Sequence, residues 1–267
     1  MEKESCGVSR CKYLLYIASG AAFICSLIVL VLFLQHKSTH DMSLASEEGM
    51  KQYLLDNPDV IIQSLKDHEA QLRKEQAEES DIRAREHFDS LLSQGVFYSV
   101  GPEDADVQIV EFHDFRCTYC RRAYAHVKKL VEEDTNVRLV IREFPVLGPL
   151  SVYASKVALA ALKHGGEEAY RKFADNMMAA DDLGAELDVR SIAENSGLDW
   201  AAIEDLVDSE EVMNILHENV VMGREKLRLT GTPAFVINGK LLRGYADYDT
   251  LKEAVAFARS EIDMDNN

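Results

Sequence analysis

The chain has 267 residues, 47% of them hydrophobic, which is typical of a globular protein with one large domain or one domain plus accessory segments. Its net charge is −17, from 46 acidic and 29 basic residues, and this argues against nucleic-acid binding as its main role. Of its five cysteines, only Cys117 and Cys120 follow the first 34 residues. This distribution argues against a small secreted domain held together by several disulfides.

Residues 13–34 form an uncharged, apolar run that is long enough to cross a bilayer as a helix, for which about 20 residues are needed. A cleaved signal peptide has a shorter apolar region, roughly 7–15 residues, with a small-residue cleavage site directly after it. The triplet at residues 43–45 offers such a site, but it lies far from the apolar run. We therefore expect an uncleaved transmembrane anchor, with a cleaved signal peptide as the alternative.

The charges around the apolar run predict its orientation. Basic residues and the free amino terminus precede the run, whereas the segment after it becomes acidic. Because positive charge stays on the cytoplasmic side, residues 1–12 are expected to form a cytoplasmic tail, with residues 38–267 outside. Cys117 and Cys120 would then lie in an oxidising compartment.

Residues 38–94 are expected to form a polar helical linker, because residues 50–93 contain almost no glycine or proline. Asn57 and Pro58 suit the start of a helix there. Apolar residues recur at helical spacing without a sustained heptad repeat, so a long coiled coil is not expected. The incomplete stripe predicts either a homo-oligomer formed through residues 50–93 or a monomeric spacer.

From residue 95 the pattern becomes that of an α/β domain. Strands rich in β-branched and aromatic residues are expected at residues 96–100, 107–112, 137–145 and 233–237. A helix is expected to follow Cys117, and residues 150–222 have a helical pattern throughout. The Asn-Gly pair at 238–239 predicts a hairpin, and a final helix closes the chain. An all-helical insertion therefore splits an α/β core.

Two motifs carry a family resemblance. VEFHDFRCTYC, at 110–120, places a strand directly before a C-x-x-C pair at a helix start, and GTPAFVING, at 231–239, follows the insertion. Over about residues 95–262, the chain resembles the DsbA-like branch of the thioredoxin fold, thiol–disulfide oxidoreductases of the bacterial cell envelope. The resemblance implies a thioredoxin-like α/β fold with an all-helical insertion at about 150–222.

The position of the cysteines predicts their chemistry. At the start of a helix, the thiol of Cys117 would meet unpaired backbone amides and the positive end of the helix dipole, which stabilise a thiolate. Cys120 lies one turn further in and is expected to be the buried resolving thiol. Arg121 and Arg122 either add to this stabilisation or are ordinary charges of the helix surface.

The resemblance also implies roles for residues outside the cysteine pair. Glu111 would transfer a proton to or from Cys120, and the alternative is a surface carboxylate on a strand. Pro233 would be a cis proline that packs against the active-site sulfurs. The exposed backbone of Thr232 before it would pair with an extended substrate segment.

Thr118 and Tyr119, between the cysteines, would contact substrate and tune the reduction potential. The strongest oxidases of the resembled family have Pro-His there. Thr232 is a residue common before the cis proline of disulfide isomerases, whereas the oxidase often has valine. The resemblance therefore favours a disulfide isomerase or a dual oxidase/isomerase, with a dedicated oxidase as the alternative.

No cofactor is expected beyond the redox-active Cys117–Cys120 disulfide, and no metal. The implied setting is a bacterial inner membrane crossed once, with the catalytic domain in the periplasm. Its partners would be unfolded or misoxidised envelope proteins and a membrane redox partner that resets the dithiol. Zinc is disfavoured because a single C-x-x-C lacks a second ligand pair, although His113 and His126 lie nearby. A membrane-tethered chaperone is the non-enzymatic alternative.

Overall fold

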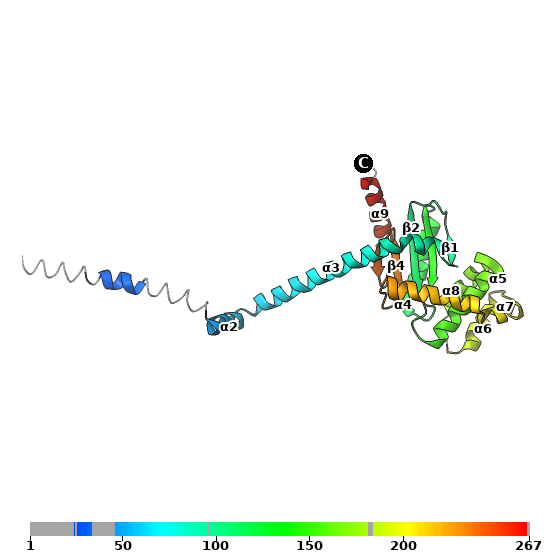
Figure 1. Cartoon of the computed structure of the whole chain (residues 1–267), viewed down its shortest axis with the longest axis horizontal. Helices are drawn as coiled ribbons and strands as arrows, with labels where there is room; N and C mark the ends of the chain where they lie inside the picture. Colours follow the sequence, from blue (N-terminus) through cyan, green and yellow to red (C-terminus); the bar gives the residue numbers. More distant parts are fainter. Residues whose placement is uncertain (1–23, 25, 34–45, 96, 181–183, 266–267) are drawn as a thin grey trace, which may run out of the picture. The chain divides into compact units, whose positions relative to one another are not determined.

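The computed structural model describes residues 24, 26–33, 46–95, 97–180 and 184–265 (Figure 1). The expected cytoplasmic tail and most of the expected anchor lie outside these residues. Within the described part of the chain, no helix combines the length and apolar character needed to cross a membrane. The chain divides into two compact units, residues 1–72 and 73–267.

The first unit contains α2 (Glu47–Asp56) and the beginning of α3 (Pro58–Ser93). Ser46 caps α2, since its hydroxyl accepts a hydrogen bond from the Gly49 amide at 3.1 Å. Pro58 opens α3, as its fixed backbone angle favours. In this unit large apolar side chains are exposed at Met50, Tyr53, Leu55, Val60, Ile61, Ile62, Leu65 and Leu72.

The second unit is built on a five-stranded sheet in the order β1-β3-β2-β4-β5. Its strands are β1 (Tyr98–Val100), β2 (Val107–His113), β3 (Val137–Glu143), β4 (Ala234–Ile237) and β5 (Lys240–Arg243). Only β2 and β3 pair in parallel, because a helix connects them, and the other neighbours are antiparallel. The hairpin of β4 and β5 turns at the Asn-Gly pair, where both residues have positive φ.

The helices divide into those that cover the sheet and those of the insertion. They are α4 (Thr118–Glu133), α5 (Pro149–Ala179), α6 (Glu186–Asn195), α7 (Trp200–Val207), α8 (Glu210–Val221), the π-helical turn η1 (Met222–Lys226) and α9 (Tyr248–Asp265). Helices α5 to α8 form the insertion between β3 and β4, close to the range expected from the sequence. Within α5, Gly166 has a φ of 69° and breaks the helical geometry.

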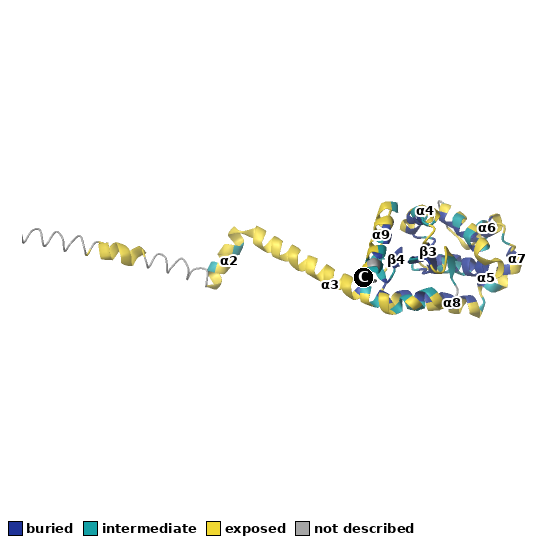
Figure 2. Cartoon of the chain, turned by 90° about the horizontal axis from the view of Figure 1, so that it is seen from above, coloured by how far each residue is buried: buried dark blue, intermediate teal, exposed yellow. Residues whose placement is uncertain are grey.

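Successive side chains of a strand point to opposite faces, so β2 contributes to two separate cores. Ile109 packs in the core that includes α4, α5 and α9. Val110 and Phe112 face the other way and pack with Ala84 and Leu91 of α3. Figure 2 shows this layering, with α4 and α9 on one side of the buried strands and α8 on the other.

The end of α3 is therefore part of the α/β domain. Ala84 and Leu91 have no exposed surface, and the compact unit begins at Arg73, earlier than the boundary at residue 95 inferred from the sequence. The helix covers a sheet face that would otherwise expose apolar side chains to water. The sequence pattern did not indicate this role because the apolar stripe of α3 is interrupted by charged residues.

Arg142 of β3 fixes the end of α3 to the sheet. Its guanidinium is buried, with 4% of the residue exposed, and burial lowers its pKa to about 10. It donates hydrogen bonds to the carbonyl oxygens of Leu91 at 2.5 Å and Gln94 at 2.6 Å, and to Oδ1 of Asn219 at 3.2 Å. The last carbonyls of a helix have no partner within the helix, so this arginine satisfies them.

We expect Arg142→Met to lower the free energy of unfolding by about 2–4 kcal/mol, because it leaves several buried carbonyl groups without a donor. Urea unfolding of the full-length chain in mild detergent, followed by the fluorescence of the single tryptophan, Trp200, measures the loss. Arg138→Met is the control, since Arg138 is also buried on β3 but donates one long hydrogen bond of 3.4 Å. Equal losses in both variants would contradict this role of Arg142.

We propose that self-association covers the exposed apolar side chains of residues 46–72. A chain of residues 38–267 is then expected to run as a homo-oligomer, and a chain of residues 73–267 as a monomer. Size-exclusion chromatography with light scattering measures both masses. A monomer mass for each of the two chains would contradict self-association and favour a spacer.

Candidate active site

The two cysteines lie at the start of α4. Cys117 is the N-cap residue with φ −75° and ψ 115°, and Cys120 lies in the first turn. Both thiols are free, with 7% of Cys117 and none of Cys120 exposed to solvent. The residue at the N-cap is thus the one that a substrate reaches first.

Asp114 shapes the turn that presents Cys117. Its buried carboxylate accepts hydrogen bonds from the amide of Arg116 at 2.8 Å and from the amides of Val146 and Leu147 at 2.9 and 3.1 Å. The backbone carbonyl of Asp114 also accepts from the Cys117 amide at 3.0 Å. Side-chain acceptors of this kind stabilise a turn in place of regular secondary structure, so Asp114 holds Cys117 at the helix start.

The loop before β4 lies against the nucleophile. The peptide bond between Thr232 and Pro233 is cis, and the thiol of Cys117 donates a hydrogen bond of 3.2 Å to the carbonyl oxygen of Thr232. The Pro233 carbonyl accepts from the Gly244 amide at 2.9 Å, which ties this loop to the segment after β5. The structure therefore brings together Cys117, Cys120, Thr232 and Pro233 from opposite ends of the domain.

The surroundings of Cys117 lower its pKa to about 5. The main cause is the hydrogen bond with the Cys120 side chain, which outweighs the effect of burial, and the backbone amides of Tyr119 and Cys120 add to it. The Thr232 carbonyl accepts a hydrogen bond from the Cys117 thiol and so favours its protonated form.

The pKa of the resolving thiol, Cys120, is shifted in the opposite direction. Burial raises the pKa of Cys120 well above its ordinary value, and the hydrogen bond to Cys117 and the charge of Glu111 raise it further. Burial also raises the pKa of Glu111 to about 7, although the nearby His113 lowers it. Glu111 is 1% exposed, which excludes the alternative of a surface carboxylate.

A buried polar cluster lies beside Glu111. Glu143 accepts hydrogen bonds from the hydroxyls of Tyr170 at 2.6 Å and Ser155 at 2.7 Å, and its carboxylate lies 3.1 Å from Nε2 of His113. Burial lowers the pKa of His113, but the Glu143 carboxylate and the charges of Glu111 and Asp114 together outweigh it, so the pKa is raised overall. Neither oxygen of Glu111 has a hydrogen-bond partner within the described part of the chain.

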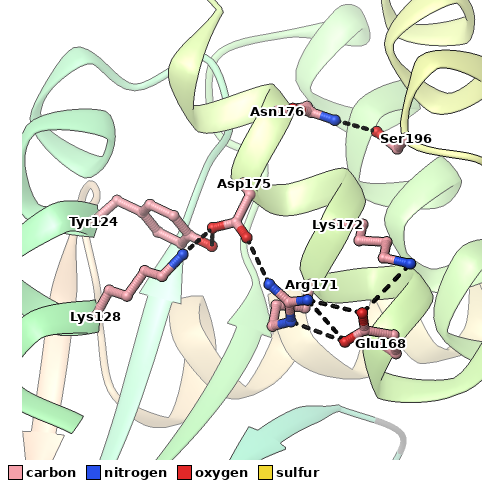
Figure 3. A network of polar contacts seen from close by, with 8 residues as sticks. All are labelled: Tyr124, Lys128, Glu168, Arg171, Lys172, Asp175, Asn176 and Ser196. Carbon is pink, nitrogen blue, oxygen red and sulfur yellow. Dashed lines mark hydrogen bonds and ion pairs between the residues drawn. The ribbon is translucent and has the colours of Figure 1, made fainter. Parts of the chain in front are cut away.

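A cavity of about 110 Å³ lies beside this cluster. Its walls include Glu111, His113, Tyr124 and Tyr170. Figure 3 shows Asp175 of α5, which accepts hydrogen bonds from the Tyr124 hydroxyl at 3.0 Å and from the Lys128 ammonium at 2.8 Å. This contact holds α4 on the insertion and keeps the walls of the cavity in place.

The remaining site residues expected from the sequence lie at the surface of the first turns of α4. Thr118 and Tyr119 are exposed. Arg121 donates a hydrogen bond of 2.5 Å to the Ala180 carbonyl, and Arg122 lies over the ring of Tyr245 at 4.6 Å. Both guanidinium groups thus have partners other than the thiolate.

Sequence reasoning did not assign roles to Asp114, Glu143, Tyr170 or Tyr245. Asp114 and Glu143 follow or end buried strands, and a carboxylate in such a place was the available signal. Tyr170 belongs to the insertion, and its contact with Glu143 depends on tertiary packing. Among the described residues, no group of three or more His, Cys, Asp or Glu side chains is arranged to hold a metal ion.

The thioredoxin family model (Thioredoxin_4) matches residues 92–256, which is more than half of the chain. The chain belongs to the thioredoxin family. The thioredoxin-like α/β fold with its helical content, expected from the sequence, is therefore confirmed.

Individual relatives agree with this thioredoxin assignment. A thioredoxin-like oxidoreductase from Silicibacter pomeroyi DSS-3 is 38% identical, with a TM-score of 0.60 over 64% of this chain and 97% of that chain. The probable disulfide bond formation protein D of Bacillus anthracis is 26% identical over 179 residues, 59% of this chain and 76% of that protein. These relatives support the expected kinship with DsbA-type thiol–disulfide oxidoreductases.

A third relative is much longer. The Na(+)/H(+) antiporter NhaA 1 of Salinispora arenicola is 33% identical over 165 residues, which are 61% of this chain and 25% of the antiporter. The chain thus spans about a quarter of the length of this curated relative.

We expect alkylation of Cys117 by iodoacetamide to follow its thiolate, with a half-maximal rate near pH 5 and a plateau above it. Cys120→Ala removes the hydrogen bond that lowers the pKa most, so it should shift the midpoint to higher pH. Mass spectrometry of the peptide that contains Cys117 measures the labelling, and Cys11→Ala serves as the control. A wild-type midpoint near about 8.5, the value of an unperturbed thiol, would contradict the description of this site.

Proposed function

We propose that this protein is a thiol–disulfide oxidoreductase that acts on extracytoplasmic proteins through Cys117 and Cys120. The observation that carries the proposal is the opposite perturbation of the two thiols. The pKa of Cys117 is lowered to about 5, whereas that of Cys120 is raised. A purely structural pair has no need for such a difference, whereas a nucleophile and a resolving thiol require it.

The exchange begins with the Cys117 thiolate. It attacks one sulfur of a substrate disulfide, so a bond forms between Cys117 and the substrate while the substrate S–S bond breaks. The second substrate sulfur leaves as a thiolate and takes up a proton. We propose that the backbone of Thr232, whose carbonyl lies 3.2 Å from the Cys117 sulfur, pairs with the substrate strand during this step.

The mixed disulfide is then resolved. Cys120 loses its proton and attacks the Cys117 sulfur, which forms the Cys117–Cys120 disulfide. The substrate sulfur that was bonded to Cys117 leaves as a thiolate and takes up a proton. The substrate gains two electrons, and the dithiol loses two. Glu111, with a pKa of about 7, is an acceptor for the Cys120 proton at neutral pH, and returns it in the reverse reaction.

We propose that the enzyme works as an isomerase or as a dual oxidase/isomerase. In isomerisation, a freed substrate thiolate attacks another disulfide of the substrate, which frees a further substrate thiolate. A substrate thiolate then attacks the substrate sulfur of the mixed disulfide, which forms a new substrate disulfide, releases Cys117 and leaves the dithiol reduced. The Cys117 pKa of about 5 supports a reduction potential between those of thioredoxin and DsbA, because their reactive cysteines have pKa values near 7 and near 3.5. The alternative is a dedicated oxidase, which would run the same steps in reverse.

We propose a bacterial inner membrane as the site of action, with residues 13–34 as the anchor and the thioredoxin domain in the periplasm. The support is the length of the apolar run and the basic residues before it. A membrane redox partner would reset the dithiol. Trapping thiols in intact cells distinguishes an isomerase from a dedicated oxidase, because the dithiol of an isomerase is kept mainly reduced and that of an oxidase mainly oxidised.

Cys117→Ala should abolish insulin reduction in the presence of dithiothreitol and the refolding of a protein with scrambled disulfides, because it removes the attacking sulfur. Cys120→Ala should instead accumulate mixed disulfides with substrate, visible as higher-mass species on a non-reducing gel. Cys11→Ala keeps the dithiol and should retain both activities. Full activity of Cys117→Ala in both assays would exclude the redox function and favour the chaperone alternative.

A further inference from the structure

A group of one arginine and two tyrosines lies at the start of α4 near the nucleophile: Tyr119 and Arg122 are exposed, and Tyr245 is half-buried. The guanidinium carbon of Arg122 is 4.6 Å from the centre of the Tyr245 ring and 5.7 Å from that of Tyr119. The two rings are 6.3 Å apart, and 55% of Tyr119 is exposed to solvent. We call these three residues the Arg122 cluster.

The Arg122 cluster is built from both halves of the active site. Tyr119 stands between the two cysteines, and Arg122 follows Cys120 by two residues. Tyr245 follows Gly244, whose amide donates a hydrogen bond of 2.9 Å to the carbonyl of the cis proline. A substrate segment that pairs with the backbone at Thr232 while its sulfur reacts with Cys117 therefore passes close to Arg122.

The position of Arg122 is fixed before any substrate arrives. Cation–π attraction holds the guanidinium over the Tyr245 ring, and the Tyr245 hydroxyl lies 3.0 Å from Nε2 of His126, one turn further along α4. Stacking on a ring face leaves the N–H groups at the edge of the guanidinium directed outward. Those groups match the two oxygens of a carboxylate.

Arg122 also differs from other cations of its helix. Lys128 pairs with Asp175 at 2.8 Å, and Lys129 lies 3.8 Å from Glu133. Arg122 makes no ion pair with any residue that the structure describes. In a chain with a net charge of −17, such a cation next to the reactive sulfur concentrates attraction for negative groups at that point.

We propose that the Arg122 cluster is a specificity subsite that binds an aspartate or glutamate side chain flanking the reacting cysteine of the substrate. This inference rests on the proposed function, because it names the substrates of the same dithiol. The enzyme should then select disulfides with acidic neighbours, which its overall negative charge would otherwise repel.

The test compares two disulfide-linked peptides that differ only in the residues flanking the cysteine, glutamate in one and glutamine in the other. The readout is the ratio of their second-order rates of reduction by the reduced full-length protein in mild detergent. Using the ratio of each variant relative to that of the wild type cancels intrinsic differences between the peptides. Arg122→Gln should lower the ratio about three- to fivefold at low salt, as an exposed ion pair allows, and added salt should narrow the gap.

Lys129→Gln is the matched control, because it removes the same charge from the far end of the same helix. It should keep the wild-type ratio. An unchanged ratio in Arg122→Gln, or an equal fall in Lys129→Gln, would overturn the subsite. Neutral hydroxyethyl disulfide separates the two proposals, since failure of the wild type to reduce it through Cys117 would overturn the proposed function instead.

Discussion

The placement of both thiols at the start of α4, where the Cys120 side chain stabilises the Cys117 thiolate, is the constraint on which the rest of the site depends. It favours the thiolate of Cys117 and the protonated thiol of Cys120, so that Cys117 serves as the nucleophile and Cys120 as the resolving thiol. The helix amides strengthen this division, because they lie where the negative charge forms. The fold supplies this setting by starting α4 at Cys117, directly after the turn held by Asp114.

Burial of the Glu111 carboxyl near this pair lowers the stability of the domain but serves its function. Glu111 is fully enclosed without a hydrogen-bond partner among the described residues, and its raised pKa of about 7 reflects that. Close by, Glu143 is satisfied by Tyr170, Ser155 and His113. A buried carboxyl that titrates near neutral pH is unfavourable for stability but suited to proton transfer, which is a recurrent feature of active sites.

The sequence predicted the parts of this protein that depend on local pattern. The C-x-x-C pair at a helix start, the strand before it and the Thr-Pro loop after the insertion are short motifs whose residue types dictate their backbone. What it did not predict depends on packing between distant segments. The contacts of Arg142 with the end of α3, of Tyr170 with Glu143 and of Tyr245 with Arg122 each join residues at least 27 positions apart. No periodicity in the chain encodes such contacts.

The most direct test of the central claim is the reduction potential of the Cys117–Cys120 pair, measured by equilibrating the protein with glutathione redox buffers. A thiolate with a pKa of about 5 stabilises the reduced form to a degree between those of thioredoxin and DsbA. We therefore expect a reduction potential between about −270 and about −120 mV. A value below about −300 mV, as in structural disulfides, would contradict it.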